Sequence, residues 1–204
     1  MPEQDDFFYA TKVWTQGAAA GKTQIENSYR LMKRQTMDLI QIHNLVDWQT
    51  HLRYLRELKE QGRLKYIGIT HYQDSSHEAL ADVVKKEQID FVQFNYSIAT
   101  RDAEKRLLPL AKDKGIATII NEPLEKGRLF DKAGNKPLPS WAGDYGIESW
   151  SGYFLKYIIS NSAVTCVIPA SSNPKHMHDN LKAGEGAMPD EQGRKKLADY
   201  FDCL

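Results

Sequence analysis

The sequence predicts an α/β fold built on a parallel sheet. Short, nearly continuous apolar runs alternate with amphipathic helical patterns, at intervals of about 25 to 30 residues. Runs without polar alternation are typical of strands covered on both faces, as in parallel sheets. Parallel strands need crossover connections, so we expect the helices to form right-handed crossovers. No Gly-x-Gly-x-x-Gly motif follows the first run, which disfavours a dinucleotide-binding doubly wound sheet.

The strands are predicted from six apolar runs that are rich in β-branched and aromatic residues. In chain order they occupy residues 7–13, 37–42, 64–70, 91–96, 116–121 and 163–168. The run at 37–42 is the clearest, because it is mostly apolar and stops at an imidazole and an amide, His43 and Asn44. A connector with many glycines and prolines, ending near residue 146, makes the interval before the last run longer than the others.

The helices are predicted between these runs, where apolar residues recur every three or four positions. They are expected at residues 23–35, 47–62, 75–87, 102–114 and 148–160, with a short helix from about 174 and a last helix from about 189. Asp47, and Asp74 or Ser75, are candidate N-caps. Gly62 and Gly115 end two of the helices, because glycine adopts the left-handed conformation of a C-cap at little cost.

Composition and charge indicate a soluble globular domain. The chain has 204 residues, of which 41% are hydrophobic and 26% charged, and we expect a single domain over residues 1–204. Lys plus Arg equals Asp plus Glu at 27 each, so no net field favours a nucleic acid or an anionic membrane as partner. No apolar run could span a bilayer, and the acidic opening at residues 1–6 is not a signal peptide. A cytoplasmic location is the default expectation, unless an upstream segment carries a targeting signal.

Cysteines and isolated histidines are not expected to form a site. Cys166 and Cys203 are too few for a disulfide framework or a metal centre, and Cys166 is expected in the core because an apolar run surrounds it. His51, His77 and His178 fall on predicted helices or at their edges, so we expect them to be solvated.

Two polar side chains stand where predicted strands end. Lys12 is near the end of the run at 7–13, and His43 directly follows the run at 37–42. If these strands are parallel neighbours, their carboxyl ends meet at one edge and bring an ammonium and an imidazole together. Taken alone, Lys12 could be a rim lysine in an ion pair and His43 a structural histidine. Together they are the candidate catalytic residues.

Six motifs in order resemble the aldo-keto reductase superfamily. They lie at residues 10–13, 38–43, 62–69, 91–96, 123–129 and 167–174, the last accompanied by Asn180. This resemblance implies a parallel (β/α)8 barrel of the TIM type and a nicotinamide cofactor. It also implies that the six strands are the third to eighth of the barrel, so that about six of eight β/α units are present. A barrel of this type takes about 250 residues, and the chain is shorter.

The resemblance further implies an active-site tetrad of Asp, Tyr, Lys and His. Only Lys12 and His43 match it, because the family's Asp and Tyr precede the segment where this chain begins. In such a tetrad the ammonium favours the ionised form of the tyrosine hydroxyl and eases proton transfer, while the histidine aligns the substrate carbonyl. Tyr9, Tyr72 and Tyr96 are poor candidates for the missing donor. We therefore expect this chain to be inactive or impaired.

Residues at the ends of the central strands match family contacts to the nicotinamide. Gln93 matches the glutamine that binds the carboxamide, and Thr70 and His71 take the place of the usual Ser-Asn pair. Asn121 stands where several members stack an aromatic ring on the nicotinamide. The resemblance thus implies that these four residues contact the cofactor.

Two later segments match contacts to the rest of the nucleotide. Leu124 and Gly127 belong to a loop that covers the pyrophosphate in the family. The remaining matched positions are the phosphate-binding Ser171, Ser172 and Asn173 and the adenine-proximal Asp179 and Asn180. Ala170 and His176 replace the Lys and Arg that bind a 2′-phosphate in many members. The resemblance implies NADP as the cofactor, and these two replacements leave NAD possible.

Three functions remain open on the sequence. The first is an aldo-keto-reductase-type oxidoreductase that transfers hydride between NADP(H) and a small carbonyl or alcohol substrate. The second is a non-catalytic module that binds a nicotinamide nucleotide and regulates a partner. The third is a lyase in which Lys12 forms a Schiff base. An arc of six strands leaves two unprotected edges, which predicts possible self-association through the open barrel edges.

Overall fold

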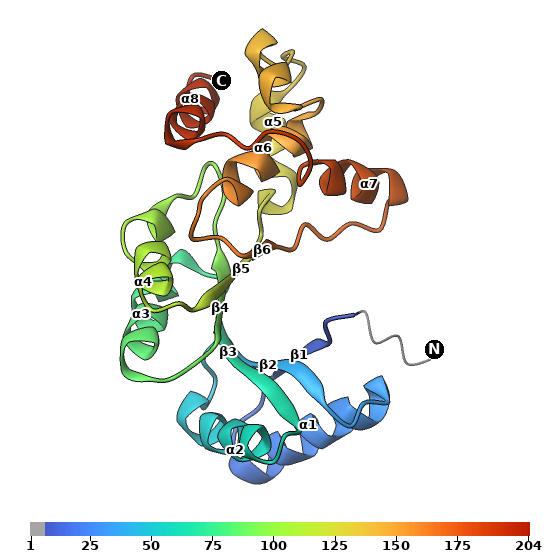
Figure 1. The fold of residues 1–204 in the computed structure, drawn as a ribbon, viewed down its shortest axis with the longest axis vertical. Coiled ribbons are helices and arrows are strands. Elements are labelled where there is room, and N and C mark those ends of the chain that lie inside the picture. Colours follow the sequence, from blue (N-terminus) through green and yellow to red (C-terminus); the bar gives the residue numbers. More distant parts are fainter. Residues whose placement is uncertain (1–6) are drawn as a thin grey trace.

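A computed structural model describes residues 7–204, and its centre is a parallel sheet of six strands (Figure 1). The strands are β1 (Ala10–Val13), β2 (Met37–His43), β3 (Leu64–Thr70), β4 (Phe91–Asn95), β5 (Ala117–Asn121) and β6 (Cys166–Val167). They neighbour one another in chain order, and each adjacent pair is parallel. The predicted parallel α/β class is confirmed. The sheet is an open arc, with β1 and β6 as its edges.

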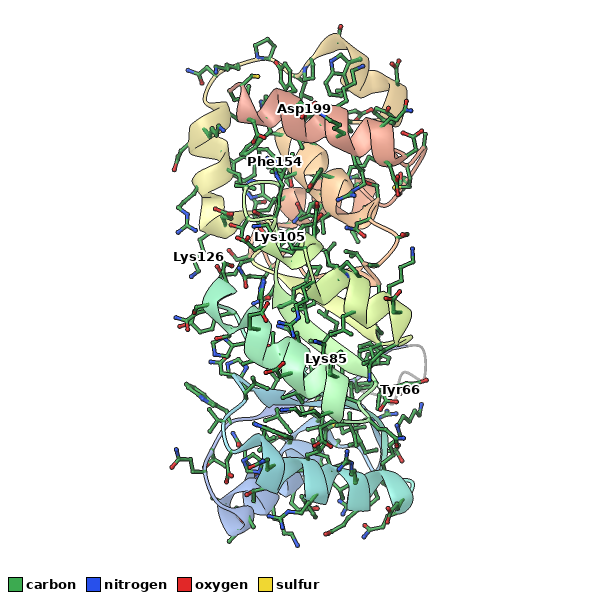
Figure 2. All side chains as sticks on the ribbon, turned by 90° about the vertical axis from the view of Figure 1, so that its left-hand side faces the viewer. Tyr66, Lys85, Lys105, Lys126, Phe154 and Asp199 are labelled. Atoms are coloured by element: carbon green, nitrogen blue, oxygen red, sulfur yellow. The ribbon has the colours of Figure 1, made fainter. Side chains whose placement is uncertain are left out.

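Helices lie between the strands and after the last of them. They are α1 (Ala18–Met32), α2 (Trp48–Glu60), α3 (His77–Lys86), α4 (Leu107–Asp113), α5 (Arg128–Ala133), α6 (Trp150–Ile159), α7 (Pro174–Lys182) and α8 (Glu191–Asp202). Short 3₁₀ helices are η1 (Asp74–Ser76), η2 (Asp102–Glu104), η3 (Glu125–Gly127) and η4 (Ser140–Tyr145). Figure 2 shows α1 and α2, α3 and α4, and α8 following one another along the long axis.

Several predicted bounds were wrong. The first helix begins at Ala18 rather than at residue 23, because three alanines, strong helix formers, extend it towards the amino end. The expected helix at 102–114 is divided into η2 and α4, and the connector contains η3, α5 and η4. Strand β1 begins at Ala10, since the Asp38 carboxylate accepts the Tyr9 amide just before the ladder starts. The acidic opening at residues 1–6 lies outside the described residues.

The last strand is shorter than the predicted 163–168. Thr118 and Thr165 exchange side-chain-to-backbone hydrogen bonds of 3.0 Å in both directions. The Thr118 hydroxyl also donates to the Ala163 carbonyl at 2.7 Å. Threonine side chains therefore take the place of ladder hydrogen bonds there, and regular pairing begins only at Cys166.

The two faces of the sheet differ in chemistry, because residues two apart along a strand share a face. One face packs against the helices and carries Val13, Ile40, Ile42, Ile67, Ile69, Val92, Phe94 and Ile120, each at most 2% exposed. The opposite, concave face carries Lys12, Gln41, His43, Thr70 and Gln93. Figure 1 shows α1 to α4 along the convex side only. The functional candidates thus share the face that these helices leave uncovered.

Cys166 does not lie in the core, contrary to expectation. It is exposed, and its register partner is Ile119 on the concave face. Because β6 is an edge strand, only its alternate residue Val167 packs against the core. The surrounding apolar run therefore did not predict which side Cys166 takes.

Two histidines expected to be solvated are buried. His51 is 2% exposed, and its Nε2 lies 2.7 Å from the Thr15 carbonyl oxygen. His77 is 7% exposed, and its Nε2 lies 3.0 Å from Asn95 Oδ1. Both rings satisfy a polar group of a neighbouring loop or strand, which sequence spacing does not reveal. His178 is exposed, as predicted.

Gly21 of α1 provides a test of this packing. A Cβ at Gly21 would lie 2.5 Å from His51 Cε1, so an alanine must displace the ring from Thr15. We expect Gly21→Ala to lower the free energy of unfolding by about 1 to 2 kcal/mol, despite the gain in helix propensity. Urea unfolding would measure it. Gly143→Ala is the control, because no atom lies within 4 Å of its added Cβ, and equal losses in both variants would contradict the argument.

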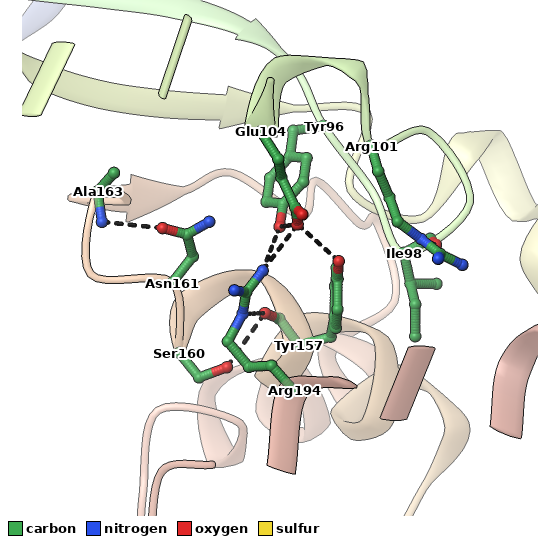
Figure 3. A network of polar contacts seen from close by, with 9 residues as sticks. All are labelled: Tyr96, Ile98, Arg101, Glu104, Tyr157, Ser160, Asn161, Ala163 and Arg194. Carbon is green, nitrogen blue, oxygen red and sulfur yellow. Dashed lines mark hydrogen bonds and ion pairs between the residues drawn. The ribbon is translucent and has the colours of Figure 1, made fainter. Parts of the chain in front are cut away.

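A partly buried polar network ties the C-terminal helices to the end of β4 (Figure 3). Glu104 of η2 accepts hydrogen bonds from the hydroxyls of Tyr96 and Tyr157, the latter at 2.6 Å. Arg194 of α8 donates to Glu104 Oε1 and to the Tyr96 hydroxyl, both at 2.8 Å. One carboxylate therefore joins η2, α6 and α8.

Within the part of the chain that the structure describes, no helix is long and apolar enough to cross a bilayer. Among the same residues no three His, Cys, Asp or Glu side chains gather in a way that could hold a metal ion.

Candidate functional site

The sheet brings the predicted catalytic pair to one edge. Lys12 is the register partner of Gln41, and His43 follows Gln41 by two residues on the same face. His43 pairs in turn with Thr70, and Thr70 with Gln93. Lys12, His43, Thr70 and Gln93 thus lie on the concave face towards the carboxyl ends of four adjacent strands. In parallel β/α folds this end of the sheet carries the ligand sites.

Burial lowers the pKa of both candidate catalytic groups, and neighbouring positive charge lowers that of His43 further. Burial lowers the pKa of the Lys12 ammonium. Burial also lowers the pKa of His43, and the charges of Lys12 and His71 lower it further. A histidine with a lowered pKa is neutral at pH 7 and carries one ring N–H. The ring of Trp14 stands edge-on to His43, with centroids 5.4 Å apart.

Thr70 and His71 differ in their surroundings. Thr70 is 1% exposed at the end of β3. The His71 ring is held within its own loop, where Nδ1 accepts from the Gln73 amide at 3.2 Å and Nε2 lies 3.2 Å from Ser76 Oγ. It also stacks on Tyr72 with centroids 5.6 Å apart. The His71 ring therefore holds its own loop, residues 71–76, in place at the carboxyl end of β3.

Unsatisfied buried polar atoms concentrate at this edge. His43 Nδ1, Asn44 Oδ1, Asn121 Oδ1 and Gln41 Oε1 are buried and have no hydrogen-bond partner among residues 7–204. Such atoms cost about 1 to 3 kcal/mol each unless a ligand or water satisfies them. Asn44 also has a positive φ of 53°, a strained backbone for a residue with a side chain. Of these atoms, the Asn44 and Asn121 amide oxygens are acceptors that fit the carboxamide and hydroxyl groups of a nicotinamide nucleotide.

Other predicted residues gather in a second place, a pocket of about 390 Å³. It is lined by Leu124, Phe130, Ser149, Trp150, Ser151, Ala170, Ser171, His176, Asp179 and Asn180. Asp179 accepts from the Ser149 hydroxyl at 2.8 Å. Asn180 accepts from the Ser151 hydroxyl at 2.5 Å and donates to the Pro169 carbonyl at 3.2 Å. Four predicted residues from two distant segments thus line one pocket.

Three predicted residues do not line this pocket. Gly127 ends η3 with a φ of 99°, a conformation that favours glycine. Ser172 is exposed. Asn173 is the N-cap of α7, and its side chain accepts from the Lys175 amide at 3.0 Å. Their predicted phosphate contacts remain untested expectations.

Sequence reasoning missed part of the site. Phe130 and Trp150 form an aromatic wall of the pocket, the first from the connector and the second from the start of α6. Gln41 was missed as well, although its Nε2 donates to Gln93 Oε1 at 2.8 Å. A polar residue in the middle of an otherwise apolar strand was the available signal.

The fold and the site define a parallel β/α domain of the barrel class, with polar groups at the carboxyl ends of its strands. The model of the aldo/keto reductase family matches residues 1–195. The chain belongs to the aldo-keto reductase family.

Curated relatives match parts of the chain. An NADH-specific methylglyoxal reductase of Escherichia coli (strain K12) is 37% identical over 75 residues, which are 37% of this chain and 22% of that protein. An uncharacterized oxidoreductase of Bacillus subtilis (strain 168) is 23% identical over 210 residues, covering 92% of this chain and 67% of that protein. The match thus spans less than a quarter of the first relative and about two thirds of the second.

Solved structures share the fold. The holo form of an aldo-keto reductase from Bacillus halodurans superposes with a TM-score of 0.78 at 20% identity, over 98% of this chain and 73% of that one. An aldo/keto reductase from Klebsiella pneumoniae in complex with NADP and acetate gives 0.78 at 22% identity, over 97% and 71%. The TIM-barrel type of the fold expected from the sequence is therefore confirmed.

Proposed function

We propose that this chain binds a nicotinamide nucleotide and aligns a small carbonyl substrate, as part of an oxidoreductase of the aldo-keto reductase type. The observation that carries the proposal is the meeting of Lys12, His43 and Gln93 on the concave face at the carboxyl ends of adjacent strands. Family membership and the pocket at Asp179 and Asn180 support it.

The nucleotide supplies or accepts a hydride when bound. The neutral His43 ring can donate one hydrogen bond to a substrate carbonyl oxygen and so orient it. The Lys12 ammonium stabilises negative charge that develops on that oxygen during reduction. Both roles require only groups that lie on the concave face.

Two candidate tyrosines, Tyr96 and Tyr9, are poorly placed as proton donors. The Tyr96 hydroxyl is fully buried and donates to Glu104, and burial raises its pKa strongly. The Tyr9 ring packs under the Arg34 guanidinium, with the cation 4.3 Å from its centroid. We therefore expect the 204-residue chain to bind nucleotide with little turnover.

A titration paired with a turnover assay tests this proposal. NADH and NADPH, each added to the purified chain, should give saturable binding by calorimetry, and rates with a panel of aldehydes should stay near the uncatalysed background. His43→Ala should leave binding within about twofold, since the imidazole is assigned to the substrate. His178→Ala on the exposed face of α7 is the control. Absence of nucleotide binding would overturn the proposal, and rapid reduction would overturn the assignment of the donor.

Two alternatives make different predictions. A regulatory nucleotide-binding module would also bind without turnover, and it is distinguished by inactivity of any longer natural chain. A Schiff-base lyase is favoured by the burial that lowers the pKa of Lys12, which increases the share of free amine. Borohydride trapping of a carbonyl adduct on Lys12 would support the lyase. Self-association through the edges β1 and β6 likewise stays a prediction.

A further inference from the structure

Gln41 is an unexpected residue for the centre of a buried strand. It is 2% exposed in the middle of β2, and its Oε1 has no partner among the described residues. An amide that leaves an acceptor unsatisfied is more costly there than an apolar side chain of similar size. Within residues 7–204, the one hydrogen bond that its side chain makes goes from Nε2 to Gln93 Oε1 at 2.8 Å.

Gly68 makes this contact possible. Gln41 and Gly68 are register partners on β2 and β3, whereas Gln93 lies one strand further, on β4. A Cβ at Gly68 would lie 2.9 Å from Gln41 Cγ and 3.1 Å from both Cβ and the carbonyl oxygen of Phe91. The Gln41 side chain therefore crosses β3 at the one position of that strand that lacks a side chain.

The contact determines which end of the Gln93 amide is free. Because Gln93 Oε1 accepts from Gln41, its NH2 group is left to donate to a ligand oxygen. Lys12 is the register partner of Gln41 on β1, and its positive charge favours the Gln41 orientation whose NH2 group faces away, towards Gln93. The flipped orientation would turn the Gln41 NH2 group towards the Lys12 ammonium, and both groups are hydrogen-bond donors.

We propose that Gln41 is a positioning residue that fixes the Gln93 amide as a hydrogen-bond donor to the carboxamide oxygen of the nicotinamide. This inference rests on the function proposed above. Gln41 itself acts only through Gln93. Gly68 supplies the space, and Lys12 favours the orientation.

The experiment compares NADH with ADP-ribose, a probe that has the pyrophosphate and adenosine but no nicotinamide. Gln41→Leu, and Gln41→Met as a second variant should the first fail to fold, are expected to weaken NADH binding about tenfold and to leave ADP-ribose binding unchanged. Gln93→Leu should give the same pattern, and the double variant should lose no more than the single ones. Gln49→Leu on the exposed surface of α2 is the matched control.

Each outcome has a distinct meaning. Equal losses for NADH and ADP-ribose would show a merely structural role and overturn the inference, as would unchanged NADH binding. Additive losses in the double variant would also overturn it. If the unmodified chain binds neither probe, the proposed function fails and takes this inference with it.

Discussion

Glu104→Gln should lower the free energy of unfolding by about 2 to 3 kcal/mol, because it removes the only charge that compensates Arg194 within this network. The side chains of Arg194 and Glu104 are 15% and 33% exposed, so this pair is better shielded than a surface ion pair. The substitution also weakens the bonds that two tyrosine hydroxyls donate to the carboxylate. The midpoint of urea unfolding at pH 7 would measure the loss. Asp199→Asn is the control, since its exposed pair with Lys195 contributes at most about 1 kcal/mol.

The same variant predicts a pH dependence. Burial by itself raises the pKa of Glu104, but the hydroxyls of Tyr157 and Tyr96 and the Arg194 charge outweigh it, so the net pKa is lowered. A carboxylate with a lowered folded-state pKa stabilises the fold above its unfolded pKa, and that stability is lost as the pH falls through the folded pKa. The difference in stability between the parent and E104Q should therefore shrink on acidification. A gap that stays constant from pH 7 to about pH 3 would contradict this.

NADPH should bind no more tightly than NADH, although the family resemblance implies NADP. The pocket at the start of α7 contains the Asp179 carboxylate, and none of its lining residues in the described chain is a lysine or arginine. A 2′-phosphate entering this pocket would meet like charge without a counter-ion, whereas a free 2′-hydroxyl can donate to a carboxylate. Dissociation constants at matched ionic strength would measure the preference.

A pair of histidine substitutions tests the charge argument. His176 lines the pocket, so His176→Arg should shift the ratio of NADPH to NADH affinity towards NADPH by about tenfold. His178→Arg makes the same change on the exposed surface of the same helix and should leave the ratio nearly unchanged. Tighter NADPH binding by the unmodified chain would refute the argument, and equal shifts in both variants would show a long-range field.

The order and class of the elements could be predicted because each strand is specified by a local run of apolar residues. The carboxyl-edge position of Lys12 and His43 followed from the same runs, since parallel neighbours share an edge. The register of the strands and the contacts that depend on it could not be predicted in this way. The Gln41 to Gln93 contact depends on residues 52 positions apart and on a glycine between them, and no local pattern encodes it.

Local sequence patterns also failed to predict whether single residues are buried or exposed. His51 is buried because a glycine on another helix leaves room for its ring. Cys166 is exposed because its strand is an edge, which depends on the order of all strands. Both outcomes follow from tertiary neighbours, whereas the patterns report only the sequence around each residue.

The chain-order arrangement of the strands has a consequence for how the molecule assembles. Because each strand pairs only with those before and after it, structure can grow by successive addition of β/α units, as in solenoid proteins. Helix α8 is different, because Arg194 must find Glu104 across 90 residues. Closing so long a loop has a large entropic cost, so docking of α8 is expected to come late in folding. Docked α8 would then hold the C-terminal β/α units against the middle of the arc. The strand β1 would be the edge of the sheet that unfolds first.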